Sequence, residues 1–329
     1  MRKIKVGAIQ PKYMEVPDRY NFMDENYKAS AAEVAEQYVK KQLDITLRLL
    51  EKAGAEGCDI VTTSENITGT SFYGMDVSDR NIFPELLELS SDIAETSLSQ
   101  LSRKFSMYIA GCYNKRIGNQ NYNIASLFDR KGEICGQYRK VHLPPDEMWQ
   151  ITEGDSIDVF QTDFGKIGIC ICYDMMFPEF VQIQALKGAE IIFHPTAGYG
   201  WYDSIGEATL RTRANDHSVY IVTAKNYLYN GAGKSSVIDF WGQTLADAGF
   251  YEDALVTREI DLDFAKTQPE WYFPTQLSGV ADVKRRKLME RKPELYEDIS
   301  RIRHEKLQVP DRAAQEELIR SIKAGRCHW

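Results

Sequence analysis

The sequence has no long apolar run. Nowhere in its 329 residues is there a stretch of about 18 apolar residues, the length that a helix needs to cross a bilayer. The chain starts with basic residues, but the apolar part of residues 1–11 is too short and too interrupted for a signal peptide. We therefore expect no membrane span, no membrane partner and a cytoplasmic location.

The sequence also lacks an excess of positive charge. It carries 40 Lys and Arg against 48 Asp and Glu, which gives a formal net charge of −8 at pH 7. Such a charge provides no long-range attraction to nucleic acid or to an anionic membrane surface. Neither is an expected partner.

Cysteine is sparse. The six cysteines are too scattered for a small disulfide framework, which suits a reducing cytoplasm. Cys170 and Cys172 form a Cys-x-Cys pair, but no second pair stands at the spacing of metal ligands. The sequence contains no glycine-rich phosphate loop and no nucleotide motif. We therefore predict no metal and no cofactor.

What the sequence does contain is an ordinary globular composition, 43% hydrophobic and 27% charged, with strands and helices in alternation. Residues 3–10, 58–63 and 107–114 are predicted strands, because each is a short run rich in β-branched and apolar residues that is bounded by polar or glycine residues. Residues 31–53 and 83–105 are predicted helices, because their apolar residues recur at helical spacing.

This order of elements occurs twice in the chain. Four pairs of stretches match in the same order, namely 3–6 with 166–169, 57–61 with 188–192, 108–114 with 220–226, and 126–132 with 236–242. Two similar sheets each need one apolar face covered. Packing sheet on sheet with helices outside predicts an α/β fold, a four-layer α-β-β-α sandwich with an internal pseudo-two-fold repeat.

The predicted sandwich domain covers residues 1–263. Residues 264–329 are rich in charge and in helix formers, and Trp271-Tyr272-Phe273 within them need a surface to lie on. We expect this segment to be a carboxyl-terminal arm that packs on the body or on a neighbouring subunit.

Residues 166–179 place a thiol where a ligand could reach it. They predict a buried strand, a turn, and a helix with Pro178 in its first turn. Cys170 lies inside the apolar run, where a cysteine is usually a small buried hydrophobe. Cys172 ends the run, and ligands bind at the carboxyl ends of strands in open α/β folds. Cys172 is therefore the candidate nucleophile.

A thiol of ordinary pKa needs a base or a positive charge nearby to react at neutral pH. Glu65 follows the strand that the repeat aligns with residues 191–193. It is therefore expected at the edge of its sheet that corresponds to the edge where the cleft residues of the other half lie. Residues 138–143 start as a strand and break at Pro144-Pro145, and Lys140 and His142 are expected on one side of it. A single glutamate or lysine is more often a solvated surface group. The prediction of a site therefore rests on Glu65, Lys140 and Cys172 together.

These stretches resemble the carbon–nitrogen hydrolases of the nitrilase superfamily, from Lys3 to about Tyr296. The resemblance rests on Ser64-Glu65, on residues 138–144 and on residues 171–179, while residues 291–296 are similar to the closing motif of the family. It implies an α-β-β-α sandwich and a homodimer or larger homo-oligomer.

The resemblance also implies roles for individual residues. Cys172 would be the nucleophile, Glu65 the general base and Lys140 the cation that stabilises the oxyanion. Glu147 would be a second carboxylate that positions the others, and the backbone N–H of Tyr173 a second oxyanion donor. The implied reaction cleaves a non-peptide C–N bond of a small amide through a Cys thioester and releases ammonia.

The residues after the nucleophile bear on the substrate. Tyr173-Asp174 is similar to the amidase and N-carbamoyl branches, whereas true nitrilases carry Trp-Glu there. Several relatives that act on amino-acid-derived carboxylates have Arg after this Asp, where this chain has Met175-Met176. A primary amide or ureido substrate with an apolar or ring-bearing tail is expected. Candidate substrate-binding residues are Phe72, Tyr73, Tyr173, His194, Tyr199 and Trp201.

Alternatives remain open at this point. The chain could hydrolyse N-carbamoyl compounds, transfer an acyl group to an amine, or be a non-catalytic relative that binds a ligand in the same cleft. The loop aromatics could instead pack on a neighbouring subunit. His194 and His217 could be satisfied structural histidines, since the implied mechanism needs neither.

Overall fold

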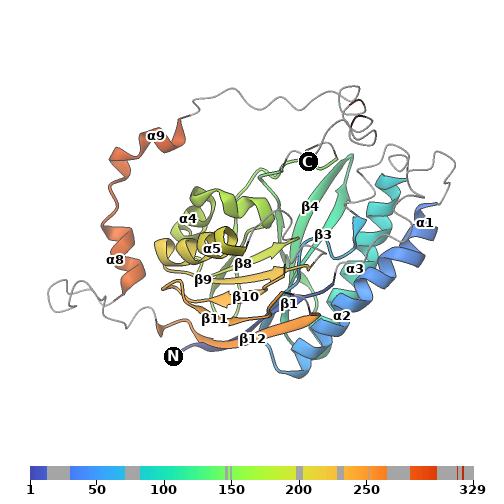
Figure 1. Ribbon diagram of the computed structural model, residues 1–329, viewed down its shortest axis with the longest axis horizontal. Helices are drawn as coiled ribbons and strands as arrows, with labels where there is room; N and C mark the ends of the chain where they lie inside the picture. Colours follow the sequence, from blue (N-terminus) through green and yellow to red (C-terminus); the bar gives the residue numbers. More distant parts are fainter. Residues whose placement is uncertain are drawn as a thin grey trace.

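The computed structural model describes residues 1–12, 30–70, 82–144, 147–148, 150–197, 203–227, 233–250, 252–264 and 282–301, with residues 317 and 321. Two six-stranded sheets lie at its centre, and helices cover their outer sides (Figure 1). The predicted α/β class and the α-β-β-α layering are therefore confirmed.

The first sheet has three parallel strands at its centre, β1, β2 and β3, with antiparallel strands on both sides. Its order is β12-β1-β2-β3-β4-β5. The strands are β1 (Lys3–Gln10), β2 (Ile60–Thr62), β3 (Tyr108–Ile117), β4 (Gln120–Phe128), β5 (Ile134–Arg139) and β12 (Ala254–Asp261).

The second sheet has the same plan. Its order is β11-β10-β9-β8-β7-β6, and β7, β8 and β9 are its parallel strands. The strands are β6 (Val159–Gln161), β7 (Lys166–Ile169), β8 (Ile191–Thr196), β9 (Tyr220–Lys225), β10 (Ser236–Ile238) and β11 (Thr244–Asp247).

The matched sequence stretches occupy equivalent places in the two sheets. β1, β2, β3 and β4 correspond in order to β7, β8, β9 and β10. With β1–β6 and β7–β12 as the two halves, one edge strand of each sheet comes from the other half. β6 follows β5 along the chain but pairs with β7, and β12 follows β11 but pairs with β1. Each half therefore completes the sheet of the other.

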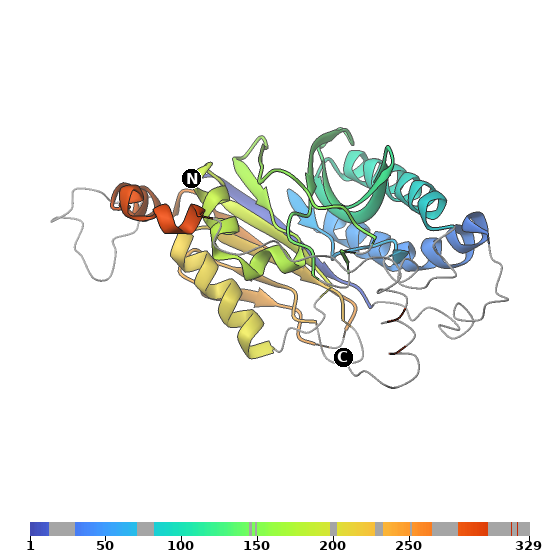
Figure 2. The ribbon, with the colours of Figure 1, turned by 90° about the horizontal axis from the view of Figure 1, so that it is seen from above.

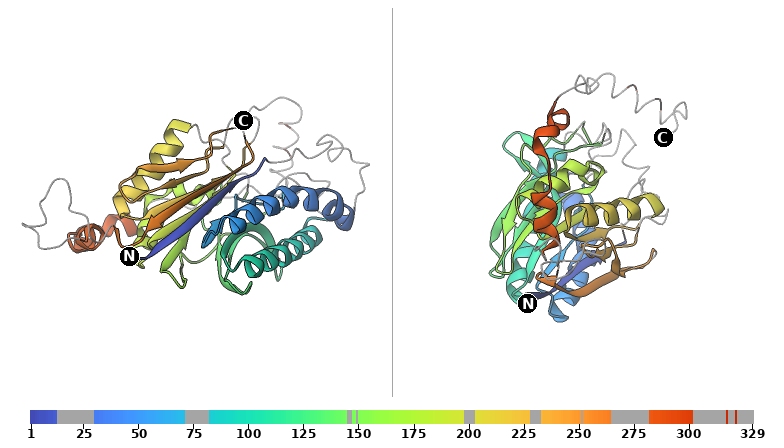
Figure 3. Two further views of the ribbon diagram at one scale, coloured as in Figure 1. Left: turned by 90° about the horizontal axis from the view of Figure 1, so that it is seen from below. Right: turned by 90° about the vertical axis from the view of Figure 1, so that its left-hand side faces the viewer.

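The helices lie on the two outer sides of the sheet pair (Figure 2). α2 (Lys40–Ala55) and α3 (Phe83–Phe105) cover the first sheet and lie side by side (Figure 3). α1 (Ala31–Val34) and a π-helical turn η1 (Ala35–Val39) pack against α3. α4 (Pro178–Leu186) and α5 (Asp203–His217) cover the second. α3 has the predicted bounds. Ser30 and Glu33 form a capping box that starts the helix predicted over residues 31–53.

The main core fills the space between the two sheets. Alternate residues of the facing strands are sealed in it, including Val6, Ile60, Ile169 and Val222. A second core lies between the first sheet and α2 and α3. None of the helices in the described part of the chain is long and apolar enough to cross a membrane.

Beyond β12 the structure describes α8 (Val283–Met289), a 3₁₀ turn η4 (Pro293–Leu295) and α9 (Glu297–Ser300). α8 contacts the body, because Lys284 Nζ donates to the carbonyl of Ala189 and Lys287 Nζ to that of Asn215. The division into a domain of residues 1–263 and an arm of residues 264–329 stays a prediction. Trp271-Tyr272-Phe273 lie outside the described residues.

Candidate active site

Cys172 lies on a strained turn at the carboxyl end of β7. The strand ends at Ile169, three residues before Cys172, and Cys172 opens a 3₁₀ turn, η3 (Cys172–Met176). Its φ of +45° lies in the left-handed region, which costs a non-glycine residue energy and is found at functional sites. Cys170 is sealed in the core, whereas Cys172 is half-buried. The turn thus separates a packing cysteine from an accessible one.

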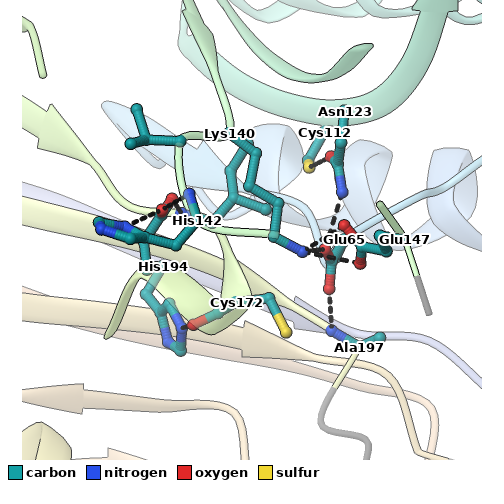
Figure 4. Close-up of polar contacts among 12 residues, drawn as sticks. Glu65, Cys112, Asn123, Lys140, His142, Glu147, Cys172, His194 and Ala197 are labelled. Carbon is teal, nitrogen blue, oxygen red and sulfur yellow. Dashed lines mark hydrogen bonds and ion pairs between the residues drawn. The ribbon is translucent and has the colours of Figure 1, made fainter. Parts of the chain in front are cut away.

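Glu65 follows β2 and lies within the protein at 3% exposure. Its Oε1 accepts hydrogen bonds from Lys140 Nζ and Asn123 Nδ2, both at 2.8 Å. Its Oε2 accepts one from the backbone N–H of Ala197 at 2.9 Å. The donors come from β4, from the segment after β5 and from the end of β8, so both sheets fix this carboxylate (Figure 4).

Lys140 brings Glu65 and Glu147 together. It has no exposed surface, and its Nζ lies 2.8 Å from Glu65 Oε1 and 2.7 and 2.8 Å from the two oxygens of Glu147. The predicted strand over residues 138–143 is wrong beyond Arg139, where β5 ends. Because the chain leaves the sheet there, Lys140 and His142 bind different acidic partners.

The pKa shifts keep Glu65 and Lys140 ionised at neutral pH. Burial raises the pKa of Glu65. The charge and the hydrogen bond of Lys140 lower this pKa, and with the bond from Ala197 they outweigh burial, so the net shift is downward. Burial lowers the pKa of Lys140, but the charges of Glu65 and Glu147 raise it well above its ordinary value. One buried ammonium is thus held between two carboxylates.

The Cys172 thiol is protonated at rest. Burial raises its pKa first and the charge of Glu65 raises it further, while Lys140 opposes both effects. The same interaction between Glu65 and the thiol, in the other direction, contributes to the low pKa of the Glu65 carboxylate, which lies near this thiol. The thiol proton therefore has an ionised acceptor beside it, and Glu65 can take that proton when the sulfur attacks.

Asp174 connects the segment that carries Lys140 to the turn that carries Cys172, a role that no sequence pattern indicated. It is fully buried and accepts from Tyr138 Oη at 2.6 Å and from the backbone N–H of Ile171 at 3.0 Å. His142 lies beside it with its backbone N–H at 2.8 Å and its Nδ1 at 3.0 Å. The carboxylate thus joins two segments 32 residues apart in the chain.

Asn123 of β4 is a second polar residue that sequence reasoning missed. Besides its bond to Glu65, its Oδ1 accepts from the Cys112 thiol at 3.5 Å. With the thiol as donor on the oxygen side of the amide, the NH₂ group of Asn123 is aimed at Glu65. A buried asparagine in an apolar strand was the available signal, because a buried amide is nearly always hydrogen-bonded.

The predicted substrate-binding residues are only partly described. Phe72, Tyr73, Tyr199 and Trp201 lie outside the described residues, so the aromatic rim stays a prediction. Tyr173 is half-buried, with its ring edge-to-face against Phe177 at 5.5 Å.

His194 of β8 has no exposed surface and contacts Thr223 and the Cys172 carbonyl. Among the described residues, no group of three His, Cys, Asp or Glu side chains could hold a metal ion.

Comparison with known proteins agrees with this geometry. The carbon–nitrogen hydrolase family model matches residues 29–270. Omega-amidase NIT2-B of Xenopus laevis is 32% identical over 242 residues, which cover 68% of this chain and 83% of that protein.

Two solved structures share the fold. A carbon–nitrogen hydrolase from Helicobacter pylori G27 superposes with a TM-score of 0.71 at 22% identity, covering 92% of this chain and 99% of that one. A mutant amidase from Nesterenkonia sp. AN1, with the acetamide moiety of fluoroacetamide added covalently at its active-site cysteine, has a TM-score of 0.66 at 21% identity, covering 90% and 96%.

The family match extends over most of the chain and includes Glu65, Lys140 and Cys172. The predicted resemblance to the nitrilase superfamily is confirmed. The chain belongs to the carbon–nitrogen hydrolase family, whose members are enzymes that hydrolyse C–N bonds.

Proposed function

We propose that this protein hydrolyses the C–N bond of a small amide through a thioester on Cys172 and releases ammonia. The observation that carries the proposal is the buried Glu65–Lys140–Glu147 group beside a thiol on a left-handed turn. A structural role alone would not require a buried lysine between two carboxylates, since apolar residues of similar volume are often at least as stable.

In the first half-reaction, the thiol proton of Cys172 passes to Glu65 while the sulfur bonds to the carbonyl carbon. The carbonyl oxygen becomes an anion, which Lys140 Nζ and the backbone N–H of Tyr173 stabilise. When this intermediate collapses, the C–N bond breaks and Glu65 gives its proton to the leaving nitrogen. Ammonia departs and the acyl group stays on the sulfur as a thioester.

The second half-reaction uses the same groups. Glu65 takes a proton from water, and the resulting hydroxide attacks the thioester carbon. The C–S bond breaks, the sulfur regains its proton from Glu65, and the acid leaves. The sum is amide plus water giving acid plus ammonia. Glu147 takes part by holding Lys140, since both of its oxygens accept from Nζ.

The relatives favour an amide over other C–N compounds. The similar Xenopus laevis protein is named an omega-amidase, and the Nesterenkonia amidase takes a covalent addition at its active-site cysteine. The residue after Asp174 is Met175, which is sealed in the core, so that position supplies no cation for a substrate carboxylate. We propose a primary amide as the substrate class.

The test is ammonia release from a panel of primary amides, terminal amides of dicarboxylic acids and N-carbamoyl compounds. Cys172→Ala should lower release from the best substrate by a factor of at least about 10³, because the nucleophile is lost. Cys170→Ala is the matched control, since this neighbouring thiol is sealed in the core, and it should keep turnover.

The products separate the alternatives. Carbon dioxide beside ammonia would indicate N-carbamoyl hydrolysis, and acyl transfer to an added amine would indicate a transferase. Strong activity only on small dicarboxylic amides would contradict the expected apolar tail. Turnover that survives in Cys172→Ala, or silence across the panel with a thiol inert to alkylation, would contradict the proposal.

A further inference from the structure

The side chain of His194 reaches the main chain of the nucleophile. His194 lies on β8 without exposed surface, and its Nδ1 is 2.9 Å from the hydroxyl of Thr223 on β9. Its Nε2 is 3.2 Å from the carbonyl oxygen of Cys172 (Figure 4). The ring thus bridges the second sheet and the turn that carries the thiol.

The partners of the ring define which nitrogen carries its proton. A carbonyl oxygen can only accept, so the contact with Cys172 requires the hydrogen on Nε2. Burial lowers the pKa of His194 to about 3, so the ring is neutral and Nδ1 has no hydrogen. Nδ1 can then only accept, and the Thr223 hydroxyl, which lies 2.9 Å from Nδ1 and 3.3 Å from the His194 carbonyl oxygen, is placed to donate to it.

The bonded carbonyl belongs to the same peptide unit as the N–H of Tyr173. A peptide unit is planar, and in its trans form the C=O and N–H bonds point in opposite directions. The described residues contain no cis peptide bond. A group that holds the carbonyl of Cys172 on one side therefore sets the direction of the Tyr173 N–H on the other.

We propose that His194 is a positioning residue for the oxyanion site, which holds the Cys172 carbonyl and so aims the Tyr173 N–H at the substrate oxygen. The inference rests on the proposed function, in which that N–H stabilises the anion. It assigns His194 to the main chain of the nucleophile instead of to direct contact with substrate.

The expected effect is moderate. The 3₁₀ turn that starts at Cys172 also constrains this carbonyl through its own i→i+3 pattern, and a carbonyl accepts two hydrogen bonds. Loss of His194 therefore loosens the peptide without releasing it. One net hydrogen bond corresponds to roughly fivefold to tenfold in rate, below the 10²–10³ seen when an oxyanion donor is removed outright.

The experiment compares three variants of His194 on the best amide of the panel. In His194→Gln, the side-chain NH₂ stands close to the position of Nε2 and can still donate to the carbonyl. His194→Asn is too short to reach it, and His194→Met has a similar volume and no donor. The readouts are kcat, KM, the rate of Cys172 alkylation by iodoacetamide and the midpoint of thermal unfolding.

Alkylation separates positioning from general damage, because attack on a methylene carbon creates no oxyanion. We expect kcat to fall about fivefold to tenfold in whichever of the Asn and Met variants folds, with KM and alkylation within about twofold of wild type. His194→Gln should recover most of the loss. His217→Asn, which removes a histidine of α5 outside the site, should leave turnover unchanged.

Each of four results would overturn the inference. Equal losses in Gln, Asn and Met variants would show that donation to the carbonyl is irrelevant, and a parallel fall in alkylation would show a merely structural role. Wild-type protein without turnover would instead contradict the proposed function, and the inference with it. Wild-type turnover with unchanged variants contradicts the inference alone.

Discussion

Lys140 Nζ lies 2.8 Å from Glu65 Oε1, and almost no surface of either residue is exposed to solvent. Taking two charges out of water costs several kcal/mol per ion, which their attraction offsets only when the geometry is good and the remaining hydrogen bonds are made. Here Asn123, Ala197 and Glu147 make those bonds. The pair therefore serves to fix the positions of two charged groups, and its net contribution to stability is small.

Removing only the lysine should be costly. Lys140→Met leaves the carboxylates of Glu65 and Glu147 facing each other without a counter-charge. We expect the free energy of unfolding to fall by about 3 to 5 kcal/mol at pH 7, measured by urea denaturation. The loss should shrink at acid pH, where the carboxylates take up protons. Lys52→Met on the exposed side of α2 is the control and should change stability by less than about 0.5 kcal/mol.

Glu65→Gln should separate alkylation from turnover. The charge of Glu65 raises the pKa of the Cys172 thiol, so its removal lowers that pKa while Lys140 stays beside the sulfur. Iodoacetamide should then react faster at pH 7, while ammonia release falls by at least about 10², because no group passes the proton to the leaving nitrogen.

Glu147→Gln is the matched control for alkylation, because Glu147 raises the same pKa by less. It should speed the iodoacetamide reaction by a smaller factor. If alkylation slows together with turnover in Glu65→Gln, Glu65 is needed to ionise the thiol at rest, and the assignment of a protonated resting thiol is wrong.

The stability of the protein should depend on pH through Glu65. Its pKa in the folded protein lies below its ordinary value of 4.5, so its contribution is present above about pH 4.5 and is lost as the pH falls through the lowered pKa. The pKa of Lys140 is raised above 10.5, so its contribution is present below about pH 10.5. Urea denaturation from pH 7 down to pH 3 should show a shallower acid loss in Glu65→Gln than in wild type.

Asp174→Asn should weaken both the fold and the reaction. An amide at this place turns an NH₂ group toward donors that now bind a carboxylate, namely Tyr138 Oη and the N–H groups of Ile171 and His142. We expect a loss of about 2 to 4 kcal/mol in the free energy of unfolding, together with a lower kcat. Asp92→Asn on the exposed face of α3 should have neither effect.

Much of the fold could be predicted from local patterns. The helix predicted over 83–105 has the bounds of α3, and the order of the repeated stretches led to the two sheets. Boundaries were less accurate where the chain leaves a sheet to build the site. The buried strand predicted within residues 166–179 ends at Ile169, before the apolar run does, because Ile171 donates its backbone N–H to Asp174 instead of to a neighbouring strand.

The sequence pointed to the charged residues of the site and missed the groups that hold them. Glu65, Lys140 and Cys172 each follow a strand, and a repeat that aligns strand ends brings such residues to one edge. Asn123 and Asp174 act through partners distant in the chain, 58 residues away for Asn123 and 36 for Asp174 with Tyr138. No local pattern specifies such pairs, because the Asn123–Glu65 pair depends on the strand order within the first sheet and the Asp174–Tyr138 pair on how the two sheets pack.

The exchange of edge strands has a consequence for the two halves as separate molecules. A fragment that ended after β6 would contain β6 without its partner β7. Its sheet of β1 to β5 would lack β12, the strand that pairs with β1. Two identical copies could complete their sheets by exchange, with β6 of each copy pairing with β1 of the other. The full chain makes the same arrangement between its own two halves. The molecule is thus built like a strand-swapped homodimer whose two subunits have been joined into one polypeptide.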